Sequence, residues 1–101
     1  MVLYLSGPIT GIENYRDRFQ RAKTDLIAKG HVPLNPAELP DGLRKYEDYI
    51  QIGIQELDVS EGIVMLPGWK KSNGAKMELL YALCHRKTIF FGTMNVPFNL
   101  T

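Results

Sequence analysis

Short apolar runs recur along the chain and alternate with longer amphipathic segments. The runs VLYLS at 2–6, GIVML at 62–66 and TIFF at 88–91 predict β-strands, and the turn-forming residues GPITG close the first of them. The segment HVPLNP at 31–36 predicts a shorter strand, and Pro33 suits an edge position because proline cannot donate a hydrogen bond to a neighbouring strand. Because GIVML is apolar throughout, we expect that strand to be covered on both faces.

Three segments between these strands carry apolar residues at helical spacing, three and four positions apart. In the first two segments these residues are Tyr15, Phe19, Ala22 and Leu26, then Tyr46, Ile50, Ile54 and Leu57. Asn14 is a suitable capping residue for the first helix, which Gly30 is expected to end. The second helix is predicted over 46–59, although Gly53 lowers its propensity by up to about 1 kcal/mol. The third is predicted over about 72–85.

Strands that alternate with helices predict an α/β fold with right-handed crossovers and a mainly parallel sheet of four strands. The tail GTMNVPFNL at 92–100 leaves a fifth strand open, and AELPDGLRK at 37–45 is expected to be loop. The chain, residues 1–101, is predicted to be a single domain, since no linker or internal repeat is visible and its length suits one core.

The loops that follow the first and third strands are the expected ligand site. In open parallel sheets, ligands bind beyond the carboxyl ends of the strands. These loops are SGPITG and PGWKKSNG, both rich in glycine and small hydroxyl residues. The second loop leads into a helix N-terminus, where free backbone N–H groups and the helix dipole favour a phosphate or a carboxylate.

The composition is that of an ordinary globular protein and disfavours several classes. With 12 Lys and Arg against 11 Asp and Glu the net charge is +1, whereas proteins that bind duplex nucleic acid normally carry a clustered excess of basic residues. The single Cys84 cannot form an internal disulfide and no Cys and His set has metal-ligand spacing, so we expect no metal and no cofactor. A reduced cysteine fits the cytoplasm, and the N-terminal run MVLYLSGPI is too short to span a membrane.

Glu78 is the most informative single residue because it interrupts the apolar part of the third helix. The sheet-facing stripe of that helix is expected to be Ala75, Leu79, Ala82 and Leu83. The 100° step per residue then places Glu78 beside this stripe, at the helix end nearest the two loops. A capping box would need Ser or Thr at position 75, and the residues four positions away are Gly and Ala, which cannot form an ion pair. Two interpretations stay open: a functional carboxylate, or an acid that complements the helix dipole.

Other candidates have equally plain alternatives. The far side of the third helix is also apolar, with Met77, Leu80, Tyr81 and Cys84. A helix that is apolar nearly all round needs further cover, which either a second subunit or the C-terminal tail would provide. Trp69 either stacks on a base or sugar or fills the edge of the core. Tyr4 is either a half-buried sheet residue or a catalytic one.

Three stretches together resemble the nucleoside 2-deoxyribosyltransferase-like superfamily. They are YLSGPITG at 4–11, LPGW at 66–69 and SNGAKMELLYA at 72–82. More closely, they resemble small, often phage-encoded proteins grouped there as a domain of unknown function, and the similarity covers about residues 2–91. The resemblance implies a flavodoxin-like (Rossmann-like) three-layer sandwich with a mainly parallel sheet of four to five strands. It also implies a homodimer or a larger homo-oligomer.

The resemblance further implies roles for individual residues. In the deoxyribosyltransferases and deoxynucleoside 5′-monophosphate N-glycosidases of that superfamily, the Glu of an S-x-G-x-x-x-E segment is the nucleophile, and it corresponds to Glu78. Tyr4 corresponds to a tyrosine that holds the nucleophile or the sugar in place. Ser72 and Gly74 correspond to residues that contact a 5′-phosphate, and Gly7 to a glycine at which the backbone approaches the ligand. The predicted substrate contacts are Gly7, Pro8, Ile9, Trp69, Ser72, Asn73 and Gly74.

The predicted chemistry is cleavage or transfer at the N-glycosidic bond of a small-molecule (deoxy)nucleoside or its 5′-monophosphate. This reaction passes through an oxocarbenium-like state, which a carboxylate beneath the sugar can stabilise or trap as a glycosyl ester. The superfamily acid that assists the leaving base corresponds here to Gly53, and Glu61 stands where another acid usually opens the third strand. Because general acid–base help is worth about 10²–10⁴ in rate, the alternative is a non-catalytic module that binds a nucleotide or a nucleotide-derived signal.

Overall fold

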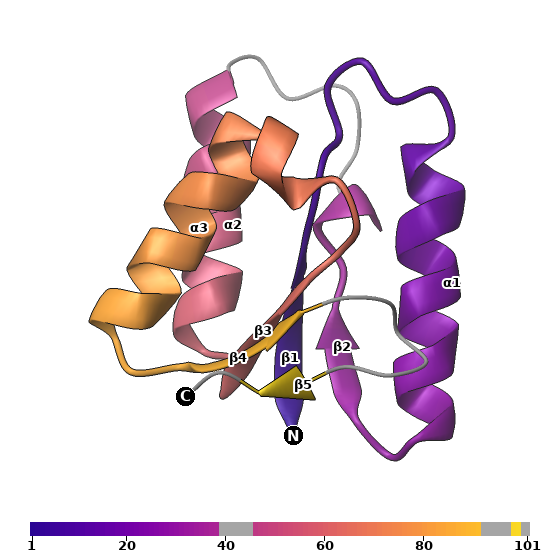
Figure 1. Ribbon diagram of the computed structural model, residues 1–101, viewed down its shortest axis with the longest axis vertical. Coiled ribbons are helices and arrows are strands. Elements are labelled where there is room, and N and C mark those ends of the chain that lie inside the picture. The colour runs from indigo at the N-terminus through magenta and orange to yellow at the C-terminus, as the bar shows by residue number, and fades with distance from the viewer. Residues whose placement is uncertain (39–45, 92–97, 100–101) are drawn as a thin grey trace.

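The computed structural model describes residues 1–38, 46–91 and 98–99. These residues form strands, helices and 3₁₀ turns that alternate along the chain (Figure 1). The strands are β1 (Val2–Ser6), β2 (Val32–Leu34), β3 (Gly62–Met65), β4 (Thr88–Phe91) and β5 (Phe98–Asn99). The helices are α1 (Tyr15–Ala28), α2 (Tyr46–Asp58) and α3 (Asn73–Cys84), and the 3₁₀ turns are η1 (Pro36–Glu38) and η2 (Trp69–Lys71).

All five strands belong to one sheet, in the order β2-β1-β3-β4-β5. β1 lies parallel to β2 and β3, β3 lies parallel to β4, and β5 runs antiparallel to β4. This is the strand order of flavodoxin-like doubly wound folds, so the predicted α/β class and the mainly parallel sheet are confirmed. The chain passes from β1 to β2 on one side and then to β3 on the other, which places the topological switch point beyond the carboxyl ends of β1 and β3.

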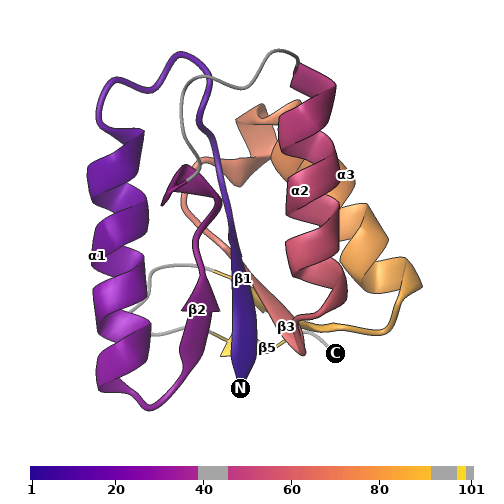
Figure 2. The same cartoon turned by 180° about the vertical axis from the view of Figure 1, so that it is seen from behind.

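The sheet is the middle of three layers. Figures 1 and 2 show α1 on one face and α2 together with α3 on the other. Because side chains alternate along each strand, the sheet separates two apolar clusters. The cluster on the α1 face contains Leu3, Leu5, Phe19, Ala22, Leu26, Ala37, Val64 and Leu66. The cluster on the α2 and α3 face contains Tyr4, Leu57, Ile63, Met65, Ala75, Ala82 and Ile89.

The strand predictions are confirmed, with shorter bounds for two strands. β1 and β4 have the predicted limits, and β2 and β3 lie inside the segments 31–36 and 62–66. β2 is an edge strand, as its proline indicates. The tail at 92–100 contributes β5, and its remaining residues lie outside the described ranges. The segment 37–45 is not entirely loop, since its first two residues complete η1 and the other seven lie outside the described ranges.

The helix predictions are confirmed within one or two residues, but the side chain of Asn14 does not cap α1. Asn14 occupies the N-cap position of α1 without a side-chain capping hydrogen bond, and its φ of −113° and ψ of 35° depart from the extended backbone typical of such caps. Ser72, with φ of −109° and ψ of 117°, does cap α3. Its hydroxyl oxygen accepts a hydrogen bond from the Ala75 N–H at 3.1 Å.

The inner face of α3 is narrower than predicted. Ala75 and Ala82 are buried and Leu79 is half-buried against the sheet, but Leu83 is 55% exposed. The prediction that Leu83 faces the sheet is wrong because Leu83 follows Ala82 by one residue and is therefore rotated by about 100° around the helix. Leu83 instead extends the exposed apolar side of α3, which includes Met77, Leu80 and Cys84.

Candidate functional site

A carboxylate joins the central strand β1 to α3. Tyr4 and Ser6 lie two residues apart on β1, so both side chains leave the sheet on the face that α2 and α3 cover. The Tyr4 hydroxyl donates a hydrogen bond to Glu78 Oε2 at 2.5 Å, and the Ser6 hydroxyl donates to Glu78 Oε1 at 2.6 Å. Such short contacts are typical of charge-assisted O–H···O⁻ bonds, at about 2.5–2.7 Å. Both carboxylate oxygens are thus held by donors from one strand.

Burial sets the acidity of this group. Tyr4 is 1% exposed and Ser6 is 0% exposed, while Glu78 is half-buried. Burial raises the pKa of Glu78, the hydrogen bonds from Ser6 and Tyr4 lower it, and the negative charge of Glu56 raises it, so that the net shift is upward. Burial is also the largest cause of the raised pKa of Tyr4. The negative charge of Glu78 and the hydrogen bond from Tyr4 to Glu78 raise this pKa further. Tyr4 therefore stays protonated as a donor, and Glu78 is a stronger base than an exposed glutamate.

Gly53 lets α2 pack directly on this pair. A Cβ atom at position 53 would lie 2.8 Å from the Tyr4 hydroxyl oxygen and 2.9 Å from Glu78 Oε2. Neither distance is a normal van der Waals contact, so a side chain at this position would displace the hydroxyl, the carboxylate or the helix. The glycine therefore closes one side of the carboxylate and leaves no room there for an acidic side chain.

A cavity of about 290 Å³ opens beside Glu78. Its walls come from β1 and the turn after it, the start of α1, η1, the first turns of α2 and the first turns of α3. The predicted site residues that line it are Tyr4, Gly7, Ile9, Ser72, Gly74 and Glu78. Its volume is near the lower end of the range of small-molecule sites, about 300–1,000 Å³. The two glycine-bearing loops that follow β1 and β3 thus meet at one ligand-sized hollow.

Three predicted substrate contacts have other surroundings and are not among the described residues that line the cavity. Trp69 packs against the apolar cluster under α3, with its ring centroid 5.4 Å from that of Phe91. Pro8 packs against the turn after β3, where a Cβ at Gly68 would lie 3.3 Å from its Cγ. Asn73 is exposed at the first position of α3. The structure therefore supports the core-edge interpretation of Trp69 rather than the stacking one.

The N-terminus of α3 forms one wall of the cavity. Ser72 is the N-cap residue and Gly74 lies in the first turn, so the free N–H groups of this turn lie near the cavity. Gly7 lines the same cavity from the turn after β1, and a Cβ at Gly7 would lie 3.0 Å from the Cβ of Leu66. A residue without a side chain is thus needed where these two loops approach each other.

Sequence reasoning missed Ser6 and six cavity-lining residues. The missed lining residues are Thr10, Tyr15, Pro36, Tyr49, Ile50 and Ala75. A signal for Ser6 exists, because the two-residue period of a strand places it on the same face as Tyr4. Pro36 and Tyr49 come from segments that the tertiary fold brings to the switch point, and no local pattern indicates their role.

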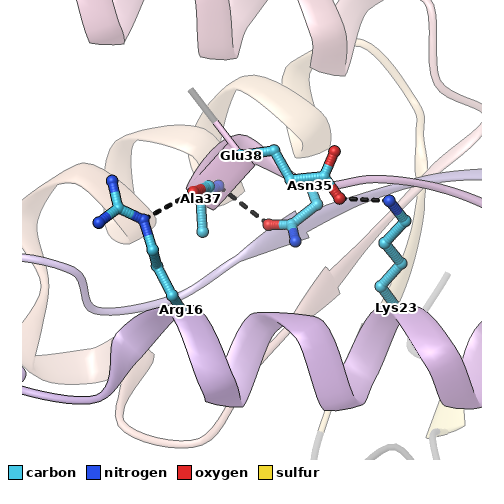
Figure 3. A network of polar contacts seen from close by, with 5 residues as sticks. All are labelled: Arg16, Lys23, Asn35, Ala37 and Glu38. Atoms are coloured by element: carbon cyan, nitrogen blue, oxygen red, sulfur yellow. Dashed lines mark hydrogen bonds and ion pairs between the residues drawn. The ribbon is translucent and has the colours of Figure 1, made fainter. Parts of the chain in front are cut away.

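Polar contacts between α1 and η1 hold the wall that carries Pro36. The Arg16 guanidinium donates to the carbonyl of Ala37 at 3.3 Å, and the Ala37 N–H donates to the buried Asn35 side chain at 2.9 Å (Figure 3). Figure 3 also shows the ion pair between Lys23 of α1 and Glu38 at the end of η1. The contacts of Arg16 and Lys23 join α1 to residues of η1 that are distant in sequence, so they fix η1 against α1, while the Asn35 contact is local.

Glu56 is a second acidic group that sequence reasoning did not single out. Its Oε1 atom is buried and has no hydrogen-bond partner among the described residues. Burial raises the pKa of Glu56, and the charge of Glu38 raises it further. The charge of Glu56 in turn contributes to the raised pKa values of Glu78 and Tyr4. Glu56 of α2 therefore adds negative charge beside the Tyr4–Glu78 pair.

Within residues 1–38, 46–91 and 98–99, no group of three or more His, Cys, Asp or Glu side chains is placed to hold a metal ion. None of the helices in these ranges has the length and apolar character needed to cross a membrane.

These features define a flavodoxin-like α/β domain with a carboxylate-bearing cavity at its topological switch point. The chain belongs to the family described as Domain of unknown function (DUF4406), whose model matches residues 1–91. That range contains β1 to β4 and every described residue that lines the cavity. A comparison with curated proteins and one with solved structures found no match.

Gly53→Ala is expected to destabilise the protein by about 1–3 kcal/mol, because the added Cβ overlaps the Tyr4 hydroxyl and the Glu78 carboxylate. This effect opposes the gain in helix propensity from glycine to alanine, about 0.5–1 kcal/mol. Urea unfolding measures the difference, with Gln55→Ala on the exposed side of α2 as a control that stays within about 0.5 kcal/mol of wild type. A Gly53→Ala protein as stable as wild type would contradict the close contact.

The raised pKa of Glu78 is expected to make stability fall as pH rises. The folded protein binds this proton more tightly than the unfolded chain, so the contribution is complete below the ordinary glutamate pKa and is lost as pH rises through the raised pKa. Glu78→Gln lacks this loss. As pH rises from the ordinary glutamate pKa through the raised pKa, the free energy of unfolding of the variant therefore increases relative to that of wild type. Chemical unfolding at a series of pH values measures it, and Glu56→Gln separates the contribution of Glu56. A difference between wild type and Glu78→Gln that does not change with pH would disprove the assignment.

Proposed function

We propose that this protein cleaves or transfers at the N-glycosidic bond of a (deoxy)nucleoside or its 5′-monophosphate, with Glu78 as the nucleophile. The observation that carries the proposal is the Glu78 carboxylate at the wall of a ligand-sized cavity, held there by the Tyr4 and Ser6 hydroxyls. A carboxylate fixed in this way is pre-oriented for attack on an anomeric carbon. The motifs that resemble the nucleoside 2-deoxyribosyltransferase-like superfamily add support, since Glu78 occupies the position of its nucleophile.

The chemistry requires a carboxylate beneath the sugar ring. As the bond from C1′ to the base breaks, positive charge develops at C1′ and the ring oxygen, and a nearby carboxylate stabilises it. Glu78 then forms a glycosyl ester, which water or a second base resolves with retention at C1′. The Tyr4 and Ser6 hydroxyls keep both carboxylate oxygens in position. Because its pKa is raised, the Glu78 carboxylate is more basic, and hence a stronger nucleophile, than an exposed glutamate.

The cavity offers a place for each part of such a substrate. The first turn of α3, with Ser72 and Gly74, suits a 5′-phosphate, because helix N-termini present free N–H groups and favourable dipoles to anions. Tyr15, Tyr49 and Ile50 line the cavity as aromatic and apolar surface that suits a flat base. Glu78 lines the same cavity as the first turn of α3 and as these aromatic and apolar residues.

A non-catalytic module that binds a nucleotide or a nucleotide-derived signal is the second candidate. Its support is Gly53, which stands where the resembling enzymes have the acid that assists the leaving base. The Tyr4 hydroxyl oxygen and Glu78 Oε2 lie within 2.9 Å of the position that a Cβ at residue 53 would take, so an acidic side chain at this residue would displace them. Binding of a nucleotide without turnover would favour this candidate.

Incubation with a panel of nucleosides, deoxynucleosides and their 5′-monophosphates tests the proposal, with free base measured by chromatography. Wild type is expected to release base, and Glu78→Gln to lose at least about 10³-fold of the rate because the nucleophile is removed. Tyr4→Phe is expected to lose about 10–100-fold, since it removes one hydrogen bond to the carboxylate. Asp25→Asn, which removes a surface charge on α1, serves as the matched control and retains the wild-type rate.

Two outcomes would count against it. Base release that persists in Glu78→Gln would remove Glu78 from the chemistry. Calorimetric binding of a panel member by wild type, with no release of base from any member, would support the binding module instead.

We also propose that the exposed apolar side of α3 forms a homodimer contact. Met77, Leu80 and Leu83 are between 55% and 63% exposed there, and a cluster of large apolar side chains on one helix face is typical of an interface.

Leu80→Asp is expected to convert a dimer to a monomer, because it places a charge at the centre of the proposed contact. Light scattering coupled to size-exclusion chromatography, under reducing conditions, measures the mass. Ile27→Asp is the matched control, since Ile27 is an exposed apolar residue on α1 at the opposite face of the sheet. A wild-type protein with the mass of one chain at micromolar concentration would rule the contact out.

A further inference from the structure

The contact between α2 and the Tyr4–Glu78 pair restricts how a leaving group can be assisted. The space at Gly53 is filled by the Tyr4 hydroxyl and Glu78 Oε2. Glu78 is itself committed to two hydrogen bonds, which hold it in the position of a nucleophile. A neutral purine or pyrimidine leaves as an anion unless it is protonated, and protonation by a positioned acid is commonly worth about 10²–10⁴ in rate. The geometry therefore favours a leaving group that needs no proton.

The charge and the surface of the cavity also favour a leaving group that carries a positive charge. Glu78 is the only residue with a charged side chain among the described residues that line it, and the nearby Glu56 adds negative charge from α2. Thr10, Tyr15, Tyr49 and Ser72 contribute hydroxyl groups, which are far weaker proton donors than a carboxyl group. The rings of Tyr15 and Tyr49 provide aromatic faces, which attract cations.

We propose that the preferred substrates are N-glycosides of a cationic aromatic ring, that is, pyridinium nucleosides and their 5′-monophosphates. The proposal rests on the proposed N-glycosidase function and narrows its substrate class. The pyridinium ring lies against Tyr15 and Tyr49 within reach of the Glu78 charge, and the phosphate binds at the first turn of α3. A cation beside a half-buried carboxylate gains more than in bulk water, because the local dielectric is lower.

The reaction then balances without an acid. An oxygen of Glu78 forms a bond to C1′ while the bond from C1′ to the ring nitrogen breaks, and its electron pair neutralises the pyridinium nitrogen. The free pyridine leaves as a neutral molecule. Water then attacks C1′, the electron pair of the ester bond returns to the Glu78 carboxylate, and one proton passes to solvent. The sum is a pyridinium nucleoside plus water giving the free sugar, the neutral pyridine and one proton.

Competition between leaving groups tests the proposal. The probes are nicotinamide riboside and its 5′-monophosphate, their neutral dihydropyridine forms, and the adenine and hypoxanthine nucleoside 5′-monophosphates. Release of free base is followed by chromatography for wild type, Glu78→Gln and the Asp25→Asn control. The expected kcat/KM for the pyridinium substrates exceeds that for the neutral bases by at least about 10²-fold. Release is lost in Glu78→Gln and kept in Asp25→Asn. The dihydropyridine forms, which match in shape but lack the charge, are not cleaved.

The outcomes separate this inference from the proposed function. Release of adenine or hypoxanthine that depends on Glu78 and is as fast as release of nicotinamide would overturn the inference and leave the N-glycosidase function standing. No Glu78-dependent release from any probe would overturn both. A pyridinium preference that survives in Glu78→Gln would also overturn the inference, because the negative charge and the nucleophile would then not be its source.

Discussion

The half-buried Glu78 carboxylate, hydrogen-bonded by two hydroxyls of β1, is the interaction on which the rest of the site depends. A carboxylate removed from water loses its hydration, and the loss is tolerable only where other donors replace it. Tyr4 and Ser6 are those donors, and they lie on one face because strand side chains alternate. The start of α3 at its Ser72 cap then decides that Glu78 faces β1 rather than solvent. The burial of the carboxylate thus depends both on the two-residue period of β1 and on the residue at which α3 begins.

Most of the fold follows from patterns that are local in the sequence. The apolar runs predict β1, β3 and β4, Pro33 indicates an edge strand, and the helical stripes predict the three helices, because each signal arises from the period of its own element. The fifth strand is different. It comprises only Phe98 and Asn99, too short for a period, and it exists by pairing with Phe90 and Phe91 of β4.

The candidate site was predictable where its chemistry depends on local geometry. Glu78 stands out because an acid on the flank of an apolar helix has no local partner, and Ser72 because a capping serine precedes a helix. Residues brought in by the tertiary fold were not predictable. Tyr49 lines the cavity because α2 packs against the sheet beside β1, and Trp69 lies at the core edge because β4 presents Phe91 beside it. For Trp69, stacking and core packing leave the same signature in the sequence.

Gly53 shows how a locally unfavourable residue can be required by its surroundings. Glycine weakens α2 by up to about 1 kcal/mol relative to alanine, so local helix propensity disfavours it at this position. The same glycine allows α2 to contact the Tyr4 hydroxyl and Glu78 Oε2 without overlap. That contact buries the carboxylate, and burial is the largest cause of its raised pKa. It also fills the space in which a second acid would stand. Local propensity and tertiary packing conflict here, and such conflicts concentrate at functional sites. Under the proposed function, the reaction therefore depends on the strength of Glu78 as a nucleophile and on the charge that the substrate itself brings.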